Sequence, residues 1–378
     1  MVHRREVIGS LLALGASPAA ATCRARKTYV GGAPFTGLTA PMLEAARASG
    51  ALPDDAALDA AFGQAMERAR PVAATAALAR AEGPIWTRTQ AAAGAQAERF
   101  YWASAGKAHT ATAVLQLVEE GRLALDAPLS RWVPAAPNAR LITAEDLLAH
   151  TSGLFSFQAD AALRARSGYK SPEEALAAAF AHPPEFCPGA AWSYSNTGYT
   201  LLGRIVELIE QRPFHEVVTA RVVDRLGLTE TTILAPQQSL AGMALPAPGP
   251  QASDGANDDV TTPWAAGPVA ASAADMVRFW RGVFAGRLHS HEITSRRFAR
   301  LYPMFGARVS FYGLGVTVTD LASASGQADL WLGHDGGLPG ATATAGYSTA
   351  RGAYFAVAFT GPGSPQATAN LLLSATAT

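Results

Sequence analysis

The sequence predicts an α/β (α+β) fold in which one sheet, flanked by helices, carries an all-helical insertion. β-like segments lie near both ends of the chain, whereas residues 128–255 show mostly helical apolar spacing. At 378 residues the chain is long enough to bury a large core. The strand-forming ends must therefore share one sheet, and the cleft between sheet and insertion is the expected place for a site.

Residues 1–21 are predicted to be a signal peptide. Arg4 and Arg5 precede an apolar run over 7–16 and small residues at 19–21. The run is too short to span a bilayer, so we expect a periplasmic or secreted protein without a membrane span. The paired arginines leave the Sec and the twin-arginine routes both open.

Residues 22–52 are expected to be an N-terminal tether, because glycines and scattered prolines fill them. The chain has two cysteines, Cys23 and Cys187, and the sequence does not establish whether they pair. Cys23 also leaves a lipoprotein anchor open, although Thr22 before it fits that signal poorly.

Segments 53–127 and 256–378 are predicted to form the α/β domain. A helix is expected over 54–68, capped by Asp54 or Asp55, and a β-hairpin over 72–81 and 85–89. A buried helix should follow Ser104. Its apolar residues recur at helical spacing (Ala111, Val114, Leu115, Val118), and Gly121 provides a stop signal.

Residues 128–255 are predicted to form the helical insertion domain. Thr143 and Asp146 match a capping box, and helical spacing recurs over 198–212 and 214–226. Beyond a loop over 245–262, the expected elements are a helix at 272–285, β segments at 312–319, 330–334, 341–347 and 353–360, and a short helix at 365–374.

Lys107 is one of only three lysines, whereas arginine supplies nearly all of the other positive charge. A desolvated lysine can lose its proton and act as a base, which arginine does not do. Ser104 lies one helical turn earlier, where the amine could activate its hydroxyl. The same spacing recurs at Ser167 and Lys170, but there Ser171-Pro172 indicates a loop that enters a helix.

Two further groups could complete a site. Tyr194 and Asn196 lie two residues apart, so in extended backbone their side chains point the same way. A tyrosine hydroxyl can relay a proton, and an asparagine amide can hold an amine or a substrate carbonyl. His334-Asp335-Gly336-Gly337 ends a β run and is predicted to begin a turn, where glycine permits close approach to a ligand. Each group alone is better explained by ordinary capping and packing.

Composition excludes several classes of function. Thirty basic and thirty acidic residues balance, so no nucleic-acid surface is expected. His289 and His291 lack a neighbouring third ligand, so no metal is expected, and no cofactor motif occurs. The chain also lacks a G-x-S-x-G elbow, which argues against an α/β-hydrolase. The expected partner is a small-molecule ester, amide or peptide substrate, bound by a monomer.

Taken in order, Ser-Ala-Gly-Lys at 104–107, Tyr-Ser-Asn at 194–196 and His-Asp-Gly at 334–336 resemble the S-x-x-K, Y-x-N and K/H-x-G elements of penicillin-recognising serine hydrolases. This family includes class C β-lactamases, D-Ala-D-Ala carboxypeptidases and related esterases. Linking stretches agree, among them Leu147-Leu148-Ala149-His150-Thr151-Ser152-Gly153-Leu154. The resemblance covers residues from about 60 to the C-terminus, and implies an antiparallel sheet of the β-lactamase/transpeptidase type.

The resemblance also implies the roles of the residues. Ser104 would form an acyl-enzyme, with Lys107 as base or as the group that keeps Tyr194 poised as one. Asn196 would orient the lysine and the substrate amide. Backbone N–H groups of Ser104 and Gly337 would form the oxyanion hole, and His334, Asp335, Gly336 and Gly337 would line the substrate site.

The third element departs from the β-lactamase pattern. His334 replaces the lysine of those enzymes, and Asp335 replaces the usual Thr or Ser that contacts a substrate carboxylate. Asp335 would repel that carboxylate if it faced the cleft, although strand alternation could turn it away. We therefore expect weak β-lactamase activity and a preference for substrates without a carboxylate. Titration of His334 would change activity between about pH 5 and 8.

Three functions remain open from the sequence. The first is a serine hydrolase for esters, amides or peptides, and the second is a D-Ala-D-Ala carboxypeptidase or β-lactamase. The third is a penicillin-binding or sensor module that stays acylated. Ser104, Lys107 and Tyr194 together favour an enzyme.

Overall fold

The structure is a computed structural model of the whole chain. It describes residues 23–377 except 49, 53, 95–96, 248–258, 323–325 and 327. The predicted signal peptide, 1–21, lies outside the described residues, as does most of the loop expected over 245–262.

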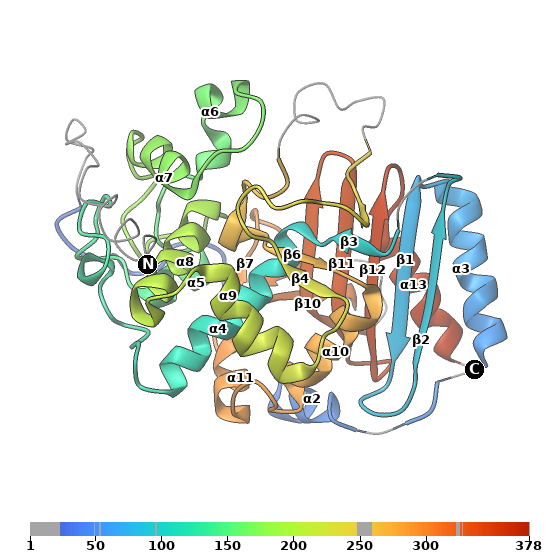
Figure 1. Cartoon of the computed structure of the whole chain (residues 1–378). Helices are drawn as coiled ribbons and strands as arrows, with labels where there is room; N and C mark the ends of the chain where they lie inside the picture. Colours follow the sequence, from blue (N-terminus) through green and yellow to red (C-terminus); the bar gives the residue numbers. More distant parts are fainter. Residues whose placement is uncertain are drawn as a thin grey trace.

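An eight-stranded antiparallel sheet forms one half of the protein (Figure 1). Its order is β2-β1-β12-β11-β10-β9-β8-β7. β1 pairs with β12 from Ala73 opposite Thr360 to Ala79 opposite Tyr354, so the two ends of the chain share the sheet, as predicted. The strands are β1 (Ala73–Ala79), β2 (Ile85–Ala91), β7 (Tyr302–Pro303), β8 (Ser310–Tyr312), β9 (Thr317–Asp320), β10 (Leu330–Leu338), β11 (Ala341–Ser348) and β12 (Ala353–Thr360).

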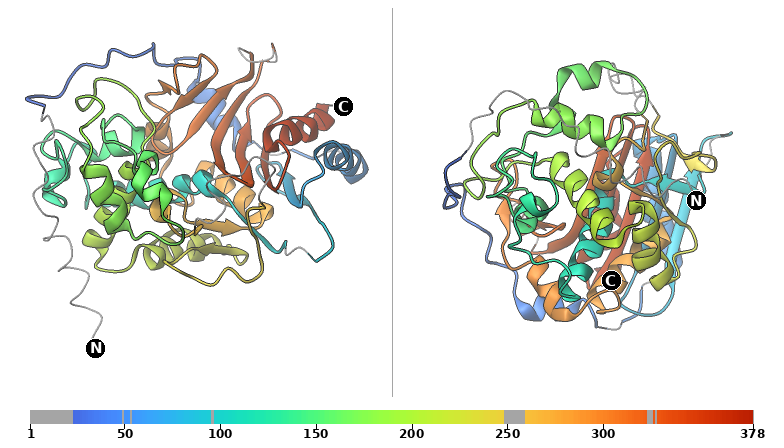
Figure 2. Two further views of the ribbon diagram at one scale, coloured as in Figure 1. Left: turned by 90° about the horizontal axis from the view of Figure 1, so that it is seen from above. Right: turned by 60° about the vertical axis from the view of Figure 1, so that its left-hand side comes forward.

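Two terminal helices cover one face of this sheet. Figure 2 shows α3 (Asp55–Ala69) and α13 (Pro365–Ser374) lying together on the far side of the sheet from the other helices. Side chains alternate along each strand, so Phe355 of β12 packs with α3 and α13, whereas Ala356 faces the main core. The helix predicted over 54–68 forms with Asp54 as its cap.

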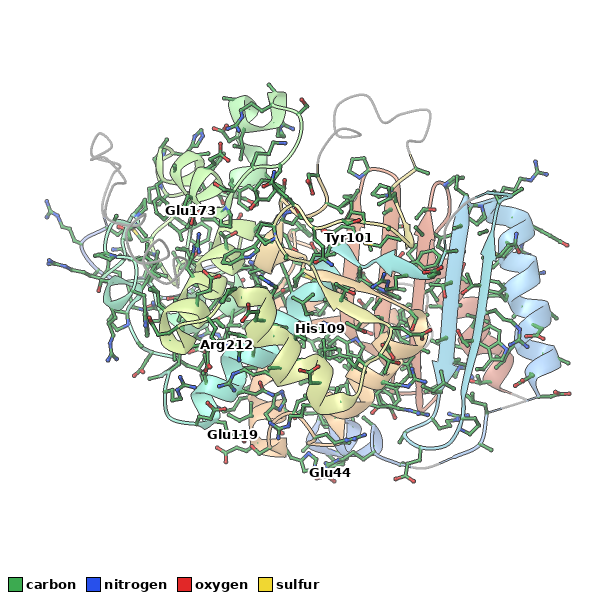
Figure 3. The ribbon with its side chains drawn as sticks, viewed as in Figure 1. Glu44, Tyr101, His109, Glu119, Glu173 and Arg212 are labelled. Atoms are coloured by element: carbon green, nitrogen blue, oxygen red, sulfur yellow. A yellow bond between two sulfur atoms is a disulfide. The ribbon has the colours of Figure 1, made fainter. Side chains whose placement is uncertain are left out.

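The opposite face packs against α10 (Ala273–Phe284) and α4 (Lys107–Glu119). Figure 3 labels His109 and Glu119 on α4, which runs from the interior beside the sheet toward the lower edge of that view. Nearly every residue of α4 is buried because sheet and helical region enclose it on both sides. A helix buried all round can carry polar side chains only where they find partners or remain neutral.

The helical region lies beyond α4. Its helices are α5 (Ala144–Ala149), α6 (Ala161–Ala165), α7 (Pro172–Phe180), α8 (Asn196–Glu210) and α9 (Phe214–Val218), which continues into a π-helical turn over Thr219–Asp224. The capping box of Thr143 and Asp146 is present at α5. A second one, Ser171 with Glu174, opens α7, where Ser171-Pro172 predicted a helix start.

Three features of the strands differ from the sequence-based expectations. A second sheet of very short strands joins β4 (Thr231–Ile233), β5 (Met243–Ala244), β6 (Val269–Ala271) and β3 (Arg99–Tyr101), in the order β4-β6-β3-β5. The run expected over 312–319 is split into β8 and β9 by a turn at Gly313–Val316. β10 does not turn at His334 but continues to Leu338, and the turn is Pro339-Gly340.

The segment expected to be a tether is packed onto the protein over residues 23–46. Cys23 forms a disulfide with Cys187, and Arg26 forms an ion pair with buried Asp146. Further along, Phe35 pairs with Leu301 and stacks on Phe311 at 4.6 Å between ring centroids. The segment therefore joins the helical region to the edge of the large sheet. A Cys23 engaged in this disulfide has no thiol left for a lipid anchor.

None of the helices in the described part of the chain combines the length and the apolar character needed to cross a membrane.

Candidate active site

Ser104 lies where the small sheet meets α4. β3 leads into a 3₁₀ turn, η2 (Ala103–Gly106), which continues directly into α4. Ala103 has a left-handed φ of 45°, a costly conformation for a residue with a Cβ, and it turns the chain sharply just before the serine. Ser104 is partly exposed although the residues on both sides are buried. Its hydroxyl is thus presented from an otherwise enclosed turn.

Lys107 is fully buried one turn beyond Ser104. Its Nζ lies 3.2 Å from Ser104 Oγ, 2.6 Å from Asn196 Oδ1 and 2.5 Å from the carbonyl oxygen of Ala266. No carboxylate in the described residues forms an ion pair with it. Burial lowers the pKa of Lys107 well below its ordinary 10.5, because the charged form loses its hydration.

A neutral amine fits these three contacts. Asn196 Oδ1 and the Ala266 carbonyl accept only, so each requires an N–H from Lys107. A neutral amine has two N–H groups and one lone pair, and the remaining neighbour is the hydroxyl of Ser104, which can donate. The arrangement can therefore take a proton from the serine.

Tyr194 and Asn196 meet the lysine from the helical region, as predicted. Lys107 Nζ lies 4.9 Å from the ring centroid of Tyr194, whose hydroxyl is buried next to Ser104. Burial raises the pKa of Tyr194 far above its usual value, and the Ser104 hydroxyl acts in the opposite direction. Asn196 is the first residue of α8, and its amide Nδ2 donates to Gln158 Oε1. This bond fixes which amide atom faces the lysine.

His334 is buried on the cleft side of β10 with both ring nitrogens engaged. Nδ1 lies 2.6 Å from the carbonyl oxygen of Asp335 and must carry the proton, so Nε2 accepts from the Tyr312 hydroxyl at 2.9 Å. Burial lowers the pKa of His334 to about 3, because the charged form loses its hydration. The titration expected between pH 5 and 8 is thus moved into the acid range.

The side chain of Asp335 points away from the cleft. Along β10, Leu332 faces the main core whereas Trp331 packs with α3 and α13, so the odd-numbered residues face those helices. The carboxylate interacts with Thr344 on β11 and with Gln366 on α13. The expected repulsion of a substrate carboxylate therefore does not arise from this side chain.

Gly336 brings β10 against the serine turn. A Cβ on Gly336 would lie 2.1 Å from the Trp102 carbonyl oxygen, so only glycine allows this approach. β9 pairs with β10 only as far as Gly333, which leaves the strand edge beyond it open. N–H groups alternate between the two edges of an antiparallel strand. Like Gly333, whose carbonyl accepts from Thr317, Gly337 directs its backbone groups to the β9 side.

These residues line a cleft of about 1670 Å³ between the sheet and the helical region. The residues that border it include Ser104, Tyr194, Asn196, His334, Asp335, Gly336 and Gly337, of which Asp335 has its carboxylate turned to Thr344 and Gln366. Its wall is mostly apolar, including Phe157, Leu163, Leu240, Leu245, Val260, Met304, Phe305 and Leu338.

The second S-x-x-K copy does not form a like pair. Ser167 is exposed, whereas Lys170 is buried, borders the cleft and donates its backbone N–H to Thr262. Helical context therefore distinguishes the two copies, as the sequence predicted.

Sequence reasoning missed four neighbours of the site. The Ala266 carbonyl and Gln158 fix Lys107 and Asn196, while Tyr312 and Tyr199 form hydroxyl contacts behind His334, 3.2 Å apart. A backbone carbonyl carries no sequence signal, and the other three lie outside the recognised motifs. Among the described residues, no three His, Cys, Asp or Glu side chains gather as metal ligands.

Comparison with known proteins finds an esterase and a putative penicillin-binding protein among the relatives of this chain. The chain is 35% identical to Esterase EstB of Burkholderia gladioli over 46% of this chain and 50% of the esterase. It is 26% identical to Putative penicillin-binding protein PbpX of Bacillus subtilis over 58% of this chain and 53% of that protein. The chain thus spans about half the length of these curated relatives.

The fold comparison covers more of the molecule. A D-stereospecific amidohydrolase from Streptomyces sp. superposes with a TM-score of 0.71 and 28% identity, over 86% of this chain and 99% of that one. The family model described as Beta-lactamase matches residues 58–377, a span that includes Ser104, Lys107, Tyr194 and the β10 strand. The chain therefore belongs to the Beta-lactamase family and shares the fold of this amidohydrolase.

Proposed function

We propose that this protein is an exported hydrolase that cleaves esters and amides of small, carboxylate-free molecules through an acyl-enzyme on Ser104. Ser104 Oγ attacks the carbonyl carbon while its proton passes to Lys107. The bond to the leaving group then breaks, that group takes the proton of the Tyr194 hydroxyl, and protonated Lys107 gives its proton back to Tyr194. Water completes the cycle by attacking the acyl carbon, which releases the acid and returns a proton to Ser104.

The contacts of Lys107 carry this proposal. Two obligate acceptors hold two N–H groups of a neutral amine, which leaves its lone pair to the Ser104 hydroxyl. Burial favours that neutral form. Tyr194 differs from Lys107 in its protonation state, because burial raises the pKa of its phenol and keeps the phenol protonated. We therefore assign the base role to Lys107 and the acid role toward the leaving group to Tyr194.

Two backbone donors would stabilise the oxyanion. The first turn of η2 leaves the Ser104 N–H without an intrahelical acceptor, and Gly337 presents its N–H at the open edge of β10. Each donor of this kind lowers the barrier by roughly 3 kcal/mol.

The cleft indicates the substrate class. His334 is neutral and Asp335 faces α13, so β10, the strand beside Ser104, offers no charge to a carboxylate. The cations that border the cleft, Arg164 and Lys170, belong to the helical region. The walls are mostly apolar, and Phe305 and Leu245 leave 76% and 48% of their surface exposed at this cleft. Such walls favour an apolar acyl group on an uncharged ester or amide.

Export is proposed from two observations. The sequence begins with signal-like residues at 1–21, and Cys23 is paired with Cys187. Disulfides persist in oxidising compartments such as the periplasm. Cell fractionation with the full-length chain tests this, and accumulation in the cytoplasm with reduced thiols would contradict it.

The activity test uses purified protein with p-nitrophenyl butyrate, a D-amino acid amide, nitrocefin and a D-Ala-D-Ala peptide. Ester or amide turnover should be abolished by Ser104→Ala. Ser167→Ala, the same change in the exposed second copy, should leave it intact. Full activity of Ser104→Ala would overturn the assignment of the nucleophile.

The same panel separates the other functions. Nitrocefin or D-Ala-D-Ala turnover at rates above those for the ester would indicate a β-lactamase or carboxypeptidase. A stable adduct with fluorescent penicillin and no turnover of any substrate would indicate a penicillin-binding module.

A further inference from the structure

Tyr194 lies in a stretch without regular secondary structure, so neither a helix nor a strand fixes its position. Its two neighbours instead bind one residue. The N–H of Ser193 donates to the backbone carbonyl of His150 at 3.0 Å, and the N–H of Ser195 donates to the Nδ1 of the same residue at 3.2 Å. His150 thus holds the chain on both sides of Tyr194.

His150 is itself held rigidly. It ends α5 in a left-handed conformation with φ of 62°, and its N–H donates to the carbonyl of Asp146. Asp146 is anchored in turn by its capping box and by Arg26. The imidazole is 1% exposed and packs with its centroid 4.3 Å from that of Tyr194 and 4.5 Å from that of Tyr312.

The bond from Ser195 requires an unprotonated Nδ1. Burial lowers the pKa of His150 well below its ordinary value, because the charged form loses its hydration, so the acceptor is present throughout the working range. The proton must then lie on Nε2, which has no hydrogen-bond partner among the described residues and faces aromatic rings. A buried nitrogen without a hydrogen-bond partner needs an explanation. Here the explanation is that the other ring nitrogen, Nδ1, accepts the hydrogen bond from Ser195.

We propose that His150 is a positioning residue for the reaction, which holds the Tyr194 hydroxyl at Ser104 through its Nδ1 and its backbone carbonyl. This rests on the proposed role of Tyr194 as proton donor. A displacement of about 1 Å in a catalytic group can cost about 100-fold in rate. Loss of the Nδ1 acceptor should therefore lower kcat and leave substrate binding nearly unchanged.

The test compares two replacements. His150→Phe keeps an aromatic ring and removes the acceptor, so kcat for p-nitrophenyl butyrate should fall about 10- to 100-fold with KM changed less than about threefold. His150→Asn places an oxygen close to the position of Nδ1 and tolerates left-handed backbone. It should recover most of kcat.

A merely structural role predicts a different result. His109→Asn alters another buried histidine, one whose ring nitrogens have no partner among the described residues, and serves as the matched control. It should lower thermal stability without lowering kcat at a temperature where the protein is folded. If His150→Phe kept wild-type kcat, or if both His150 variants lost kcat only in proportion to folded protein, the proposal would be overturned.

Should His150→Phe fail to fold, His150→Asn and His150→Gln remain informative. Glutamine keeps polarity but carries its acceptor one bond further out, so it should rescue less than asparagine, and equal rescue would contradict the proposal. Failure of the proposed function is distinguishable, because it would appear as activity retained by Ser104→Ala.

Discussion

Lys107 Nζ makes its longest hydrogen bond, 3.2 Å, to Ser104 Oγ, and its two shorter bonds, 2.6 and 2.5 Å, to the acceptors Asn196 and Ala266. The two acceptors bind the two N–H groups of the amine. The lone pair of the nitrogen is left to face the hydroxyl of Ser104. Burial without a carboxylate partner keeps that nitrogen unprotonated.

Lys107→Arg should abolish turnover. Arginine stays protonated even when buried, so no lone pair would face Ser104, and we expect kcat/KM to fall by at least about 1000-fold. Steady-state ester hydrolysis measures this loss. Lys27→Arg, the same change at an exposed position, should retain wild-type activity. Substantial activity in Lys107→Arg would assign the base elsewhere.

Stability should fall as the pH drops below about 6.5. His109 and His334 have pKa values lowered to about 3 and His289 to about 4 by burial, and His150 is lowered in the same direction. Below pH 6.5 these histidines bind protons in the unfolded chain but remain neutral in the native protein. Each histidine thus removes about 1.4 kcal/mol per pH unit below 6.5, down to its native pKa.

The four shifts act in the same direction, so the stability lost on acidification becomes comparable with the whole stability of a typical domain. Thermal melts between pH 7.5 and 4.5 should show a steep fall in Tm. His109→Asn removes one of the four groups and should flatten that fall by about a quarter. A Tm independent of pH between 7 and 5 would contradict the buried, neutral state of these histidines.

The disulfide should support the Tyr194 loop as well as the N-terminal segment. Cys187 lies seven residues before Tyr194, and between them Pro188 and Ala190 accept hydrogen bonds from Lys27 and Val30. The Cys23→Ser, Cys187→Ser double variant should lose roughly 2–5 kcal/mol of stability, since the bond closes a loop with a sequence separation of 164 residues.

Melting curves with and without dithiothreitol test this prediction. The reductant should lower the Tm of the wild type to that of the double variant and leave the double variant unchanged. Backbone hydrogen exchange at 187–190 should accelerate in the reduced wild type and in the double variant. An equal Tm with and without reductant would show that the bond contributes no stability.

The sequence predicted the shared sheet, the helical insertion and the residues that meet at Lys107, because helical spacing, capping residues and strand alternation are local signals. It did not predict β3 or β5, whose two or three residues are too few for a periodic pattern. The glycines at 336 and 337 predicted a turn, whereas the structure uses Gly336 for close strand packing. The Ala266 carbonyl and the roles of both His150 acceptors are tertiary features that no local pattern contains.

Phe305 should determine preference for apolar acyl groups. It lies between β7 and β8 with a strained φ of 50° and 76% of its surface exposed. The backbone strain and the exposure of an aromatic ring to water are both unfavourable. Its ring lies edge-on to Trp192 at 5.2 Å and 6.3 Å from the ring of Tyr194, at the cleft. A substrate acyl chain that covered this ring would gain about 25 cal/mol per Å² of apolar surface removed from water.

Phe305→Ala should therefore lower kcat/KM about tenfold for p-nitrophenyl octanoate and less than about twofold for the acetate, since only the longer chain reaches the ring. Val30→Ala, which alters an exposed apolar residue away from the cleft, should leave both substrates unaffected. Because 76% of the surface of Phe305 is exposed, its truncation should change Tm little. An equal loss for both esters would mean that Phe305 supports Tyr194 rather than the acyl group, because the proton donor serves every substrate whereas an acyl contact serves only those long enough to make it.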